Sequence, residues 1–149
     1  MLEVMIAILT IAAFLTGTLQ LMAFTALYKV RSERQAQANF WIQEDFEDVK
    51  YLASTLAFDE KWCTGEEGYA TALKEQLIAN PPAPNPKPFV RKDYSLYQTF
   101  NITPTNPHRL RIDYRVEATD KTSKDYPNQE DVIAKSSVEV VPDASFECP

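Results

Sequence analysis

The sequence predicts an α+β fold in which one long N-terminal α-helix packs on a small antiparallel β-sheet. Three features of the chain support this prediction. Residues 4–28 are apolar and uncharged, residues 29–57 contain no glycine or proline and repeat apolar side chains at helical spacing, and residues 93–141 contain runs that alternate with a period of two. With 149 residues, the chain has room for one modest core beside the apolar segment.

The first predicted element is an apolar helix over residues 1–28. Its 25 uncharged residues would span roughly 37 Å as a helix, whereas the hydrocarbon core of a bilayer is about 30 Å thick. A secretory signal has a shorter apolar stretch, about 7–15 residues, behind a basic front. The threonines and Gly17 suit close packing against other helices, although an ordinary single-pass anchor tolerates the same residues.

The charges at the two ends of this segment are unusual for an anchor. Glu3 stands at its start without a lysine or arginine before it, and a carboxylate near lipid is costly unless it is paired or reaches the interface. The basic cluster instead follows the segment, and taken alone it would place the next domain in the cytoplasm. A basic leader before Met1, removed from the mature protein, would allow the opposite orientation. The cluster consists of Lys29, Arg31 and Arg34.

The second part of the chain, residues 29–149, is predicted to be a globular head. Its first portion, residues 29–57, continues the helix with one apolar and one polar face. The apolar face, which we expect to cover the sheet, carries Ala38, Ile42, Phe46, Val49, Ala53 and Leu56. The opposite face, which we expect to be solvated, carries Glu33, Gln37, Glu44, Glu47, Asp48 and Lys50.

Shorter elements follow the long helix. A short helix is predicted over residues 64–79, because Thr64 and Glu67 have the spacing of a capping box and Asn80-Pro81 ends the pattern. The proline-rich residues 80–88 are predicted to be an extended connector. Residues 89–149 are predicted to form the antiparallel sheet and a C-terminal tail. The expected strands are residues 93–104, 109–119 and 131–141, joined as a meander.

The two cysteines, Cys63 and Cys148, are far apart and lack the CxxC spacing or neighbouring histidine of a metal site. A disulfide between them is favoured and implies an oxidising compartment, while two unrelated buried thiols remain the alternative. The bridge would fasten the region after the long helix to the C-terminal tail. By the loop-entropy model it would contribute about 4–5 kcal/mol.

Composition and motifs argue against several functions. The chain has 15 lysines and arginines against 21 aspartates and glutamates, so we expect no binding to nucleic acid. His108, the sole histidine, is expected in an exposed turn, and no nucleophile with a base is evident. We therefore expect no enzymatic activity, no cofactor and no metal. An acidic loop lacks the ligand spacing of a calcium site; it contains Asp120, Asp125, Asn128, Glu130 and Asp131.

The stretch MLEVMIAILTIAAF resembles the N-terminus of type IV pilins and of the related type II secretion pseudopilins. In that family a cleavage site precedes a Glu-Val pair and an apolar run, and the glutamate is the fifth residue of the mature chain. Glu3 matches this glutamate, so the resemblance implies that about two residues are missing before Met1. The resemblance covers residues 1 to about 30 in sequence and the remainder in layout only.

The resemblance implies a filament subunit without enzymatic activity. A prepilin peptidase would remove the leader, and the new N-terminal residue would be methylated. Subunits would begin in the inner membrane, with a single pass and the head outside the cytoplasm. They would then pack their N-terminal helices as the core of an extracellular pilus or a periplasmic pseudopilus. Glu3 would pair with the N-terminal ammonium of a neighbouring subunit.

We therefore expect a structural subunit of a type IV pilus-like filament, either a major or a minor pilin. Its partners would be copies of itself, other pilins, the peptidase and the assembly platform. A pseudopilin of a type II secretion system shares every feature used here and remains an alternative. A second alternative is a single-pass, membrane-anchored binding module. The sequence offers no residue constellation for a membrane-tethered enzyme.

Overall fold

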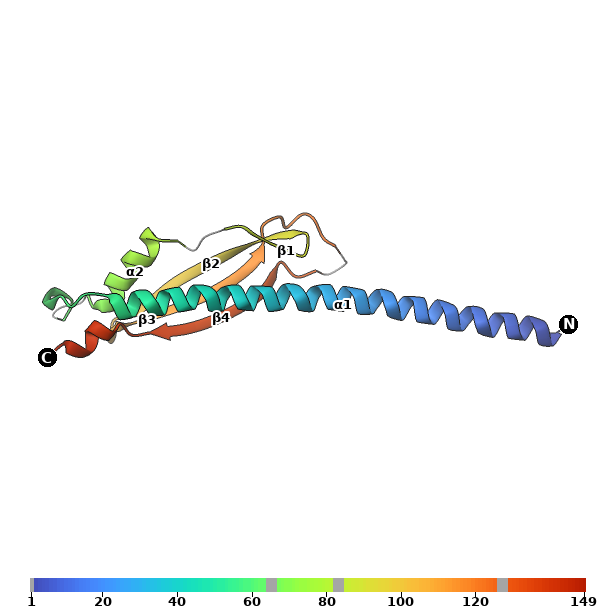
Figure 1. Cartoon of the computed structure of the whole chain (residues 1–149), viewed down its shortest axis with the longest axis horizontal. Coiled ribbons are helices and arrows are strands. Elements are labelled where there is room, and N and C mark those ends of the chain that lie inside the picture. Colours follow the sequence, from blue (N-terminus) through green and yellow to red (C-terminus); the bar gives the residue numbers. More distant parts are fainter. Residues whose placement is uncertain (1, 64–66, 82–84, 126–128) are drawn as a thin grey trace. The chain divides into compact units, whose positions relative to one another are not determined.

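The computed structural model describes residues 2–63, 67–81, 85–125 and 129–149. The chain divides into two compact units, residues 1–34 and residues 35–149, which are described separately below. Helix α1 (Leu2–Thr55) belongs to both units, and all other elements belong to the second (Figure 1). The α+β fold predicted from the sequence is confirmed, with one long helix and a small antiparallel sheet.

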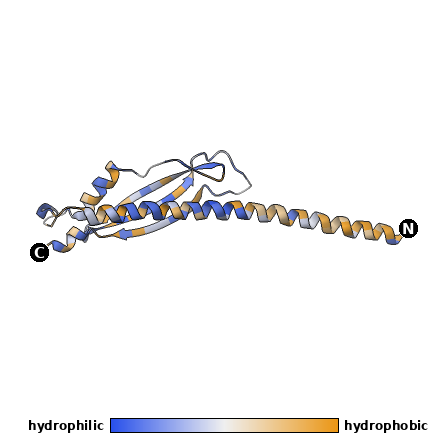
Figure 2. Ribbon diagram, in the orientation of Figure 1, coloured by the Kyte–Doolittle hydropathy of each residue, from blue (hydrophilic) through white to orange (hydrophobic). Residues whose placement is uncertain are grey.

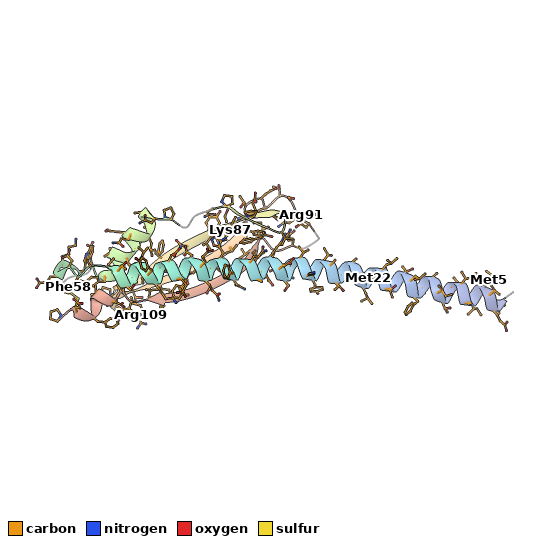
Figure 3. All side chains as sticks on the ribbon, in the orientation of Figure 1. Met5, Met22, Phe58, Lys87, Arg91 and Arg109 are labelled. Carbon is orange, nitrogen blue, oxygen red and sulfur yellow. A yellow bond between two sulfur atoms is a disulfide. The ribbon has the colours of Figure 1, made fainter. Side chains whose placement is uncertain are left out.

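In the first unit, α1 is apolar on all sides over residues 4–28, which are called its first half below. By length and composition it is able to cross a membrane, and no residue of its most apolar stretch is buried. Figure 2 shows the hydrophobic colouring of this half giving way to alternating colours in the second half. The side chains of Met5 and Met22 point outward from the helix (Figure 3). An apolar surface of this kind requires lipid or other protein as its surroundings.

The second unit is built on a four-stranded antiparallel sheet with strand order β1-β2-β3-β4. The long strands are β2 (Lys92–Thr103), β3 (Asn106–Ala118) and β4 (Val132–Val140), close to the three predicted segments. Leu96 pairs with Val116, and Val116 pairs with Ala134, so apolar residues of one face lie side by side across the strands. This face forms the sheet side of the core.

The second half of α1 supplies the opposite side of the core. Ala38, Ile42, Val49 and Ala53 are buried as predicted, and Phe46 is partly buried. Trp41, which the predicted stripe omits, is 2% exposed and meets Phe89 edge-on, with ring centroids 5.6 Å apart. The predicted solvated face is exposed, and its members form surface ion pairs such as Lys50–Glu47 and Lys87–Glu44.

Helix α2 (Tyr69–Ala79) begins later than the capping-box pattern predicts, with Gly68 at its N-cap; Thr64 lies outside the described residues. The physical reason is a contact with the start of β3. The Tyr69 backbone N–H donates to His108 Nδ1 at 3.3 Å, which satisfies one of the free donors of the first turn. Gly68 fits because a Cβ there would lie 2.2 Å from the Pro107 carbonyl oxygen.

A short strand, β1 (Lys87–Phe89), forms where the sequence predicts only the end of the connector. The turn to β2 places Val90 and Arg91 at positive φ, 42° and 67°, as a type I′ turn in a two-residue hairpin requires. Upstream, the Asn85 side chain exchanges two hydrogen bonds with the backbone of Leu96, at 3.0 and 3.3 Å. Asn85 therefore continues the pairing of β2 where β1 ends.

Cys63 and Cys148 are joined by a disulfide, as predicted, with their Cα atoms 5.4 Å apart. The bridge closes a loop over a sequence separation of 85 residues. It links the 3-10 helix Glu60–Trp62, which follows α1, to the 3-10 helix Asp143–Glu147, which follows β4. The bridge therefore connects the chain just after α1 to the C-terminal tail covalently.

Candidate functional site

The candidate site is the apolar half of α1 with Glu3 at its start. Glu3 lies in the first turn of α1 and is exposed. A carboxylate there interacts favourably with the partial positive charge of the helix N-terminus, typically by about 0.3–1 kcal/mol at an exposed position. That contribution is small beside the penalty for leaving a carboxylate unpaired in an apolar environment. Glu3 therefore needs water, a lipid headgroup region or a positively charged partner.

The threonine hydroxyls of this half are satisfied by the helix itself. The Thr10 and Thr18 hydroxyls donate to carbonyl oxygens three residues earlier, both at 2.9 Å. The Thr16 and Thr25 hydroxyls donate to carbonyls four residues earlier, both at 2.7 Å. Because they are already bonded, these hydroxyls place little demand on a neighbouring helix. Glu3 differs from them, because no hydrogen bond of its side chain occurs within the described residues.

Gly17 leaves an open notch on the same helix. A Cβ added there would meet no atom within 4 Å, so the glycine is not required by the packing of the isolated chain. A glycine in a helix interior costs about 1 kcal/mol relative to alanine. Close approach by another helix is one use for such a position.

A second polar group lies in the core of the second unit. Asp45 of α1 is 7% exposed and accepts a hydrogen bond from Gln98 Nε2 of β2. The Tyr114 hydroxyl of β3 faces the same carboxyl group, and Tyr114 is paired with Gln98 across the strands. These groups form a polar layer in an otherwise apolar interface between helix and sheet. The sequence-derived stripe did not include Asp45, since it counted only apolar residues.

Burial governs the ionisation of this polar layer. Burial raises the pKa of the Asp45 carboxyl, and the nearby Asp48 charge adds to the effect, while Tyr114 and Gln98 oppose it. Burial also raises the pKa of the Tyr114 hydroxyl, and the Asp45 charge raises it further. A tyrosine with a raised pKa is a neutral group at physiological pH and has no role as a base.

The remaining sequence candidates do not converge on a site. His108 lies in β3 rather than in a turn and is half-buried, where its Nδ1 caps α2. In the acidic loop, Lys124 pairs with Asp131 and Thr122 donates to Asp120, and these contacts hold the pKa of both carboxyls below their usual range. Asn128 lies outside the described residues. Within the described part of the chain, no three histidine, cysteine or acidic side chains gather as a metal site would require.

The solvent face of the sheet carries an open hollow of about 450 Å³. It is lined by Thr99, Asp113 and Arg115 together with residues 135–137 of β4. Ser137 and then Arg111 hold the pKa of the Asp113 carboxyl below its usual range. The hollow is therefore lined by charged groups of both signs, with Asp113 beside Arg115 and Lys135. Comparison of the chain with models of known protein families, with curated protein sequences and with solved structures gives no significant match.

Proposed function

We propose that this protein is a structural subunit of a type IV pilus-like filament, a major or minor pilin, that assembles through the first half of α1. One observation carries the proposal: Glu3 opens a helix that stays apolar through residue 28, and the same helix then packs on an antiparallel sheet. The resemblance of the N-terminal stretch to pilins supports the same function. So does the disulfide, which favours a head outside the cytoplasm.

The physical basis of assembly is the need to pair Glu3. In a bilayer, Glu3 at the very start of the span can reach the polar interface. In a filament core that water does not reach, it needs a cation, which the N-terminal ammonium of a second subunit would supply. A buried ion pair has strict geometric requirements, so this contact would also fix the axial register between subunits.

This proposal sets the location and partners of the protein. Before assembly it would span the inner membrane once, with the head outside the cytoplasm. After assembly it would lie in an extracellular filament, in contact with copies of itself or other pilins. A prepilin peptidase and the assembly platform would act on it in the membrane. Neither step requires a catalytic group, cofactor or metal in the head.

The test is the substitution Glu3→Gln, with Glu33→Gln as the matched control, because Glu33 is exposed on α1 beyond the apolar half. Removing one partner of a buried ion pair costs about 3–5 kcal/mol, and each 1.4 kcal/mol is a factor of ten in an equilibrium constant. We expect filaments counted by electron microscopy to be nearly absent in Glu3→Gln and normal in Glu33→Gln. Both variants should remain folded and in the membrane fraction. Normal filament numbers in Glu3→Gln would overturn the proposal.

The same filament counts and membrane fractions also test two alternatives. A pseudopilin of a type II secretion system would give lost secretion of exoproteins rather than lost surface filaments. A single-pass, membrane-anchored binding module is favoured by the open hollow on the solvent face of the sheet. Such a module would stay in the membrane fraction, and the protein would be missing from sheared filaments.

A further inference from the structure

The two edges of the sheet differ in how they are protected. Strand β1 has three residues, and its central residue, Pro88, has no backbone N–H to offer a further strand. Short strands and prolines are common ways of blocking sheet extension. Strand β4 has nine residues without proline, and its pairing with β3 is regular from Ala134 to Val140. Beyond Tyr94 the outer strand on the β1 side is β2 itself, and its pairing is irregular between Ile102 and Thr103. The regular β4 edge is therefore the one better suited to accept another strand.

The outer edge of β4 is open within the described chain. Among the described strands, β4 pairs only with β3. A hollow of about 610 Å³ runs beside the first part of β4 and is lined by the consecutive residues 130–135. An edge of this kind presents backbone N–H and C=O groups in the arrangement that a further strand would bind. The side chains of β4 then decide which strand fits.

The alternation of β4 restricts how it pairs with a second copy of itself. Ala134, Ser136 and Val138 belong to the core face, whereas Lys135 and Glu139 are exposed on the solvent face. A slip of one residue would put core-face residues opposite solvent-face residues. When two β4 strands pair antiparallel about a two-fold axis, core-face residues lie opposite core-face residues only if the axis lies at a residue, which then faces its own copy. An axis between two residues would mix the faces.

Charge selects one of these registers. With the axis at Ser137, Lys135 lies directly opposite Glu139 of the second copy, and the symmetry produces this ion pair twice. With the axis at Lys135, two lysines would face each other, which is destabilising. With the axis at Ser136, Glu139 would lie opposite Ile133. Within its own chain, Glu139 is contacted at Oε2 by Arg109 at 3.2 Å, and both side chains are about half exposed.

We infer that the open edge of β4 is a self-association surface, on which a second copy of this chain pairs antiparallel about Ser137. The pairing would join two sheets of four strands into one continuous sheet. A single strand edge is a small interface, so the association should be weak and reversible. The inference does not depend on the proposed function, because it rests on the second unit alone.

The symmetry has a geometric consequence. Strand β4 runs in the same direction as the second half of α1 (Figure 1). A two-fold axis that reverses β4 also reverses this helix, so the two heads in the pair point in opposite directions. Subunits of one polar filament all point the same way. If the proposed function holds, the contact joins heads of different filaments and not neighbours within one.

The first test uses the full chain in detergent with the substitution Ser137→Cys. Directly opposite residues in antiparallel strands have Cα atoms about 4.5–5.5 Å apart, a separation that a disulfide spans. Under mild oxidation we expect a disulfide-linked dimer on a non-reducing gel. The control is Arg115→Cys, which places a thiol on the same solvent face in β3, between β2 and β4. Equal dimer formation by the two variants would overturn the inference.

The second test exchanges the charges in the Ser137→Cys background. Lys135→Glu alone and Glu139→Lys alone each create two like-charge pairs, so we expect the dimer yield to fall about tenfold or more in both. The double variant Lys135→Glu/Glu139→Lys restores two opposite-charge pairs and should restore the yield. Failure of this restoration would rule out the register. These variants leave Glu3 unaltered, so failure of the cross-link and failure of filament assembly can be told apart. Conversely, Glu3→Gln in the Ser137→Cys background should leave the cross-link yield unchanged.

Discussion

The two halves of α1 form one helix but satisfy their polar groups in different ways. In the first half, the threonine hydroxyls bond to the helix backbone, and the apolar side chains are exposed. In the second half, Asp45 bonds to Gln98 of the sheet, and Trp41 packs in the core. The second half therefore finds its partners within the chain. The first half has the composition of a surface that packs against lipid or other protein.

This difference separates stability from assembly. Substitutions in the second unit should change the free energy of unfolding of the head and leave membrane retention unaltered. Substitutions in the first half should do the reverse. The following predictions test that separation, beginning with the largest expected effect.

Removing the disulfide should have the largest effect on the head. In the double variant Cys63→Ser/Cys148→Ser, the unfolded chain regains the freedom of a long loop, which corresponds to about 4–5 kcal/mol by the loop-entropy model. Domains of this size are usually stable by about 5–15 kcal/mol. Urea unfolding followed by tryptophan fluorescence, to which the buried Trp41 contributes, should therefore show a large fall in midpoint. An unchanged midpoint would contradict the prediction, as would loss of the protein from the membrane fraction.

The glycines allow a matched comparison between the two regions. Gly68→Ala puts a Cβ against the backbone of Pro107, and overpacking of this kind usually costs about 1–3 kcal/mol. Gly17→Ala adds a methyl group in open space and should favour the helix by about 1 kcal/mol. We expect a lower urea midpoint of the head for Gly68→Ala and an unchanged midpoint for Gly17→Ala. Equal midpoints in the two variants would show that the Gly68–Pro107 contact is not a constraint.

Local patterns predicted most of the fold because most of its elements follow local rules. The alternation of residues 93–141 predicted three strands, and the apolar stripe predicted which face of α1 is buried. The start of α2 was not predictable locally, because its first N–H is bonded by His108, which lies 39 residues away in the sequence. Strand β1 likewise depends on its pairing with β2 and not on its own proline-rich composition.

The candidate site divides in the same way. Glu3 was identifiable from a carboxylate at the start of an apolar run, since the cost of that placement is local. The sequence does not identify a group that would pair with Glu3, and no described residue of the same chain bonds to it. Asp45 was missed because a polar residue in a stripe of apolar ones is recognised only when the sheet supplies Gln98 and Tyr114 opposite it.

The smallest expected effect is the pH dependence due to Asp45. Because burial raises its pKa in the folded state, protonation favours folding. The stabilisation is complete below the unfolded pKa of about 3.9 and is lost as the pH rises through the raised folded value. The pKa values of Asp113, Asp120 and Asp131 are lowered in the folded state. Their contributions to stability are therefore lost below about pH 4, whereas that of Asp45 changes above this pH.

The substitution Asp45→Asn isolates this effect, since asparagine keeps an acceptor for Gln98 and carries no charge at any pH. Between pH 7 and pH 4 the urea midpoint of the unaltered protein should rise relative to that of Asp45→Asn, and at pH 7 the variant should be at least as stable. Asp48→Asn removes an exposed charge one turn away that adds to the raised pKa of Asp45. Between pH 7 and pH 4 the urea midpoint of the unaltered protein should therefore also rise relative to that of Asp48→Asn, but by less. If Asp45→Asn were instead less stable at pH 7 by more than at pH 4, the ionised carboxylate would be the stabilising form. The hydrogen bond from Gln98 would then stabilise the ionised Asp45 carboxylate by more than its burial costs. The ionised carboxylate would in that case strengthen the packing of the second half of α1 on the sheet.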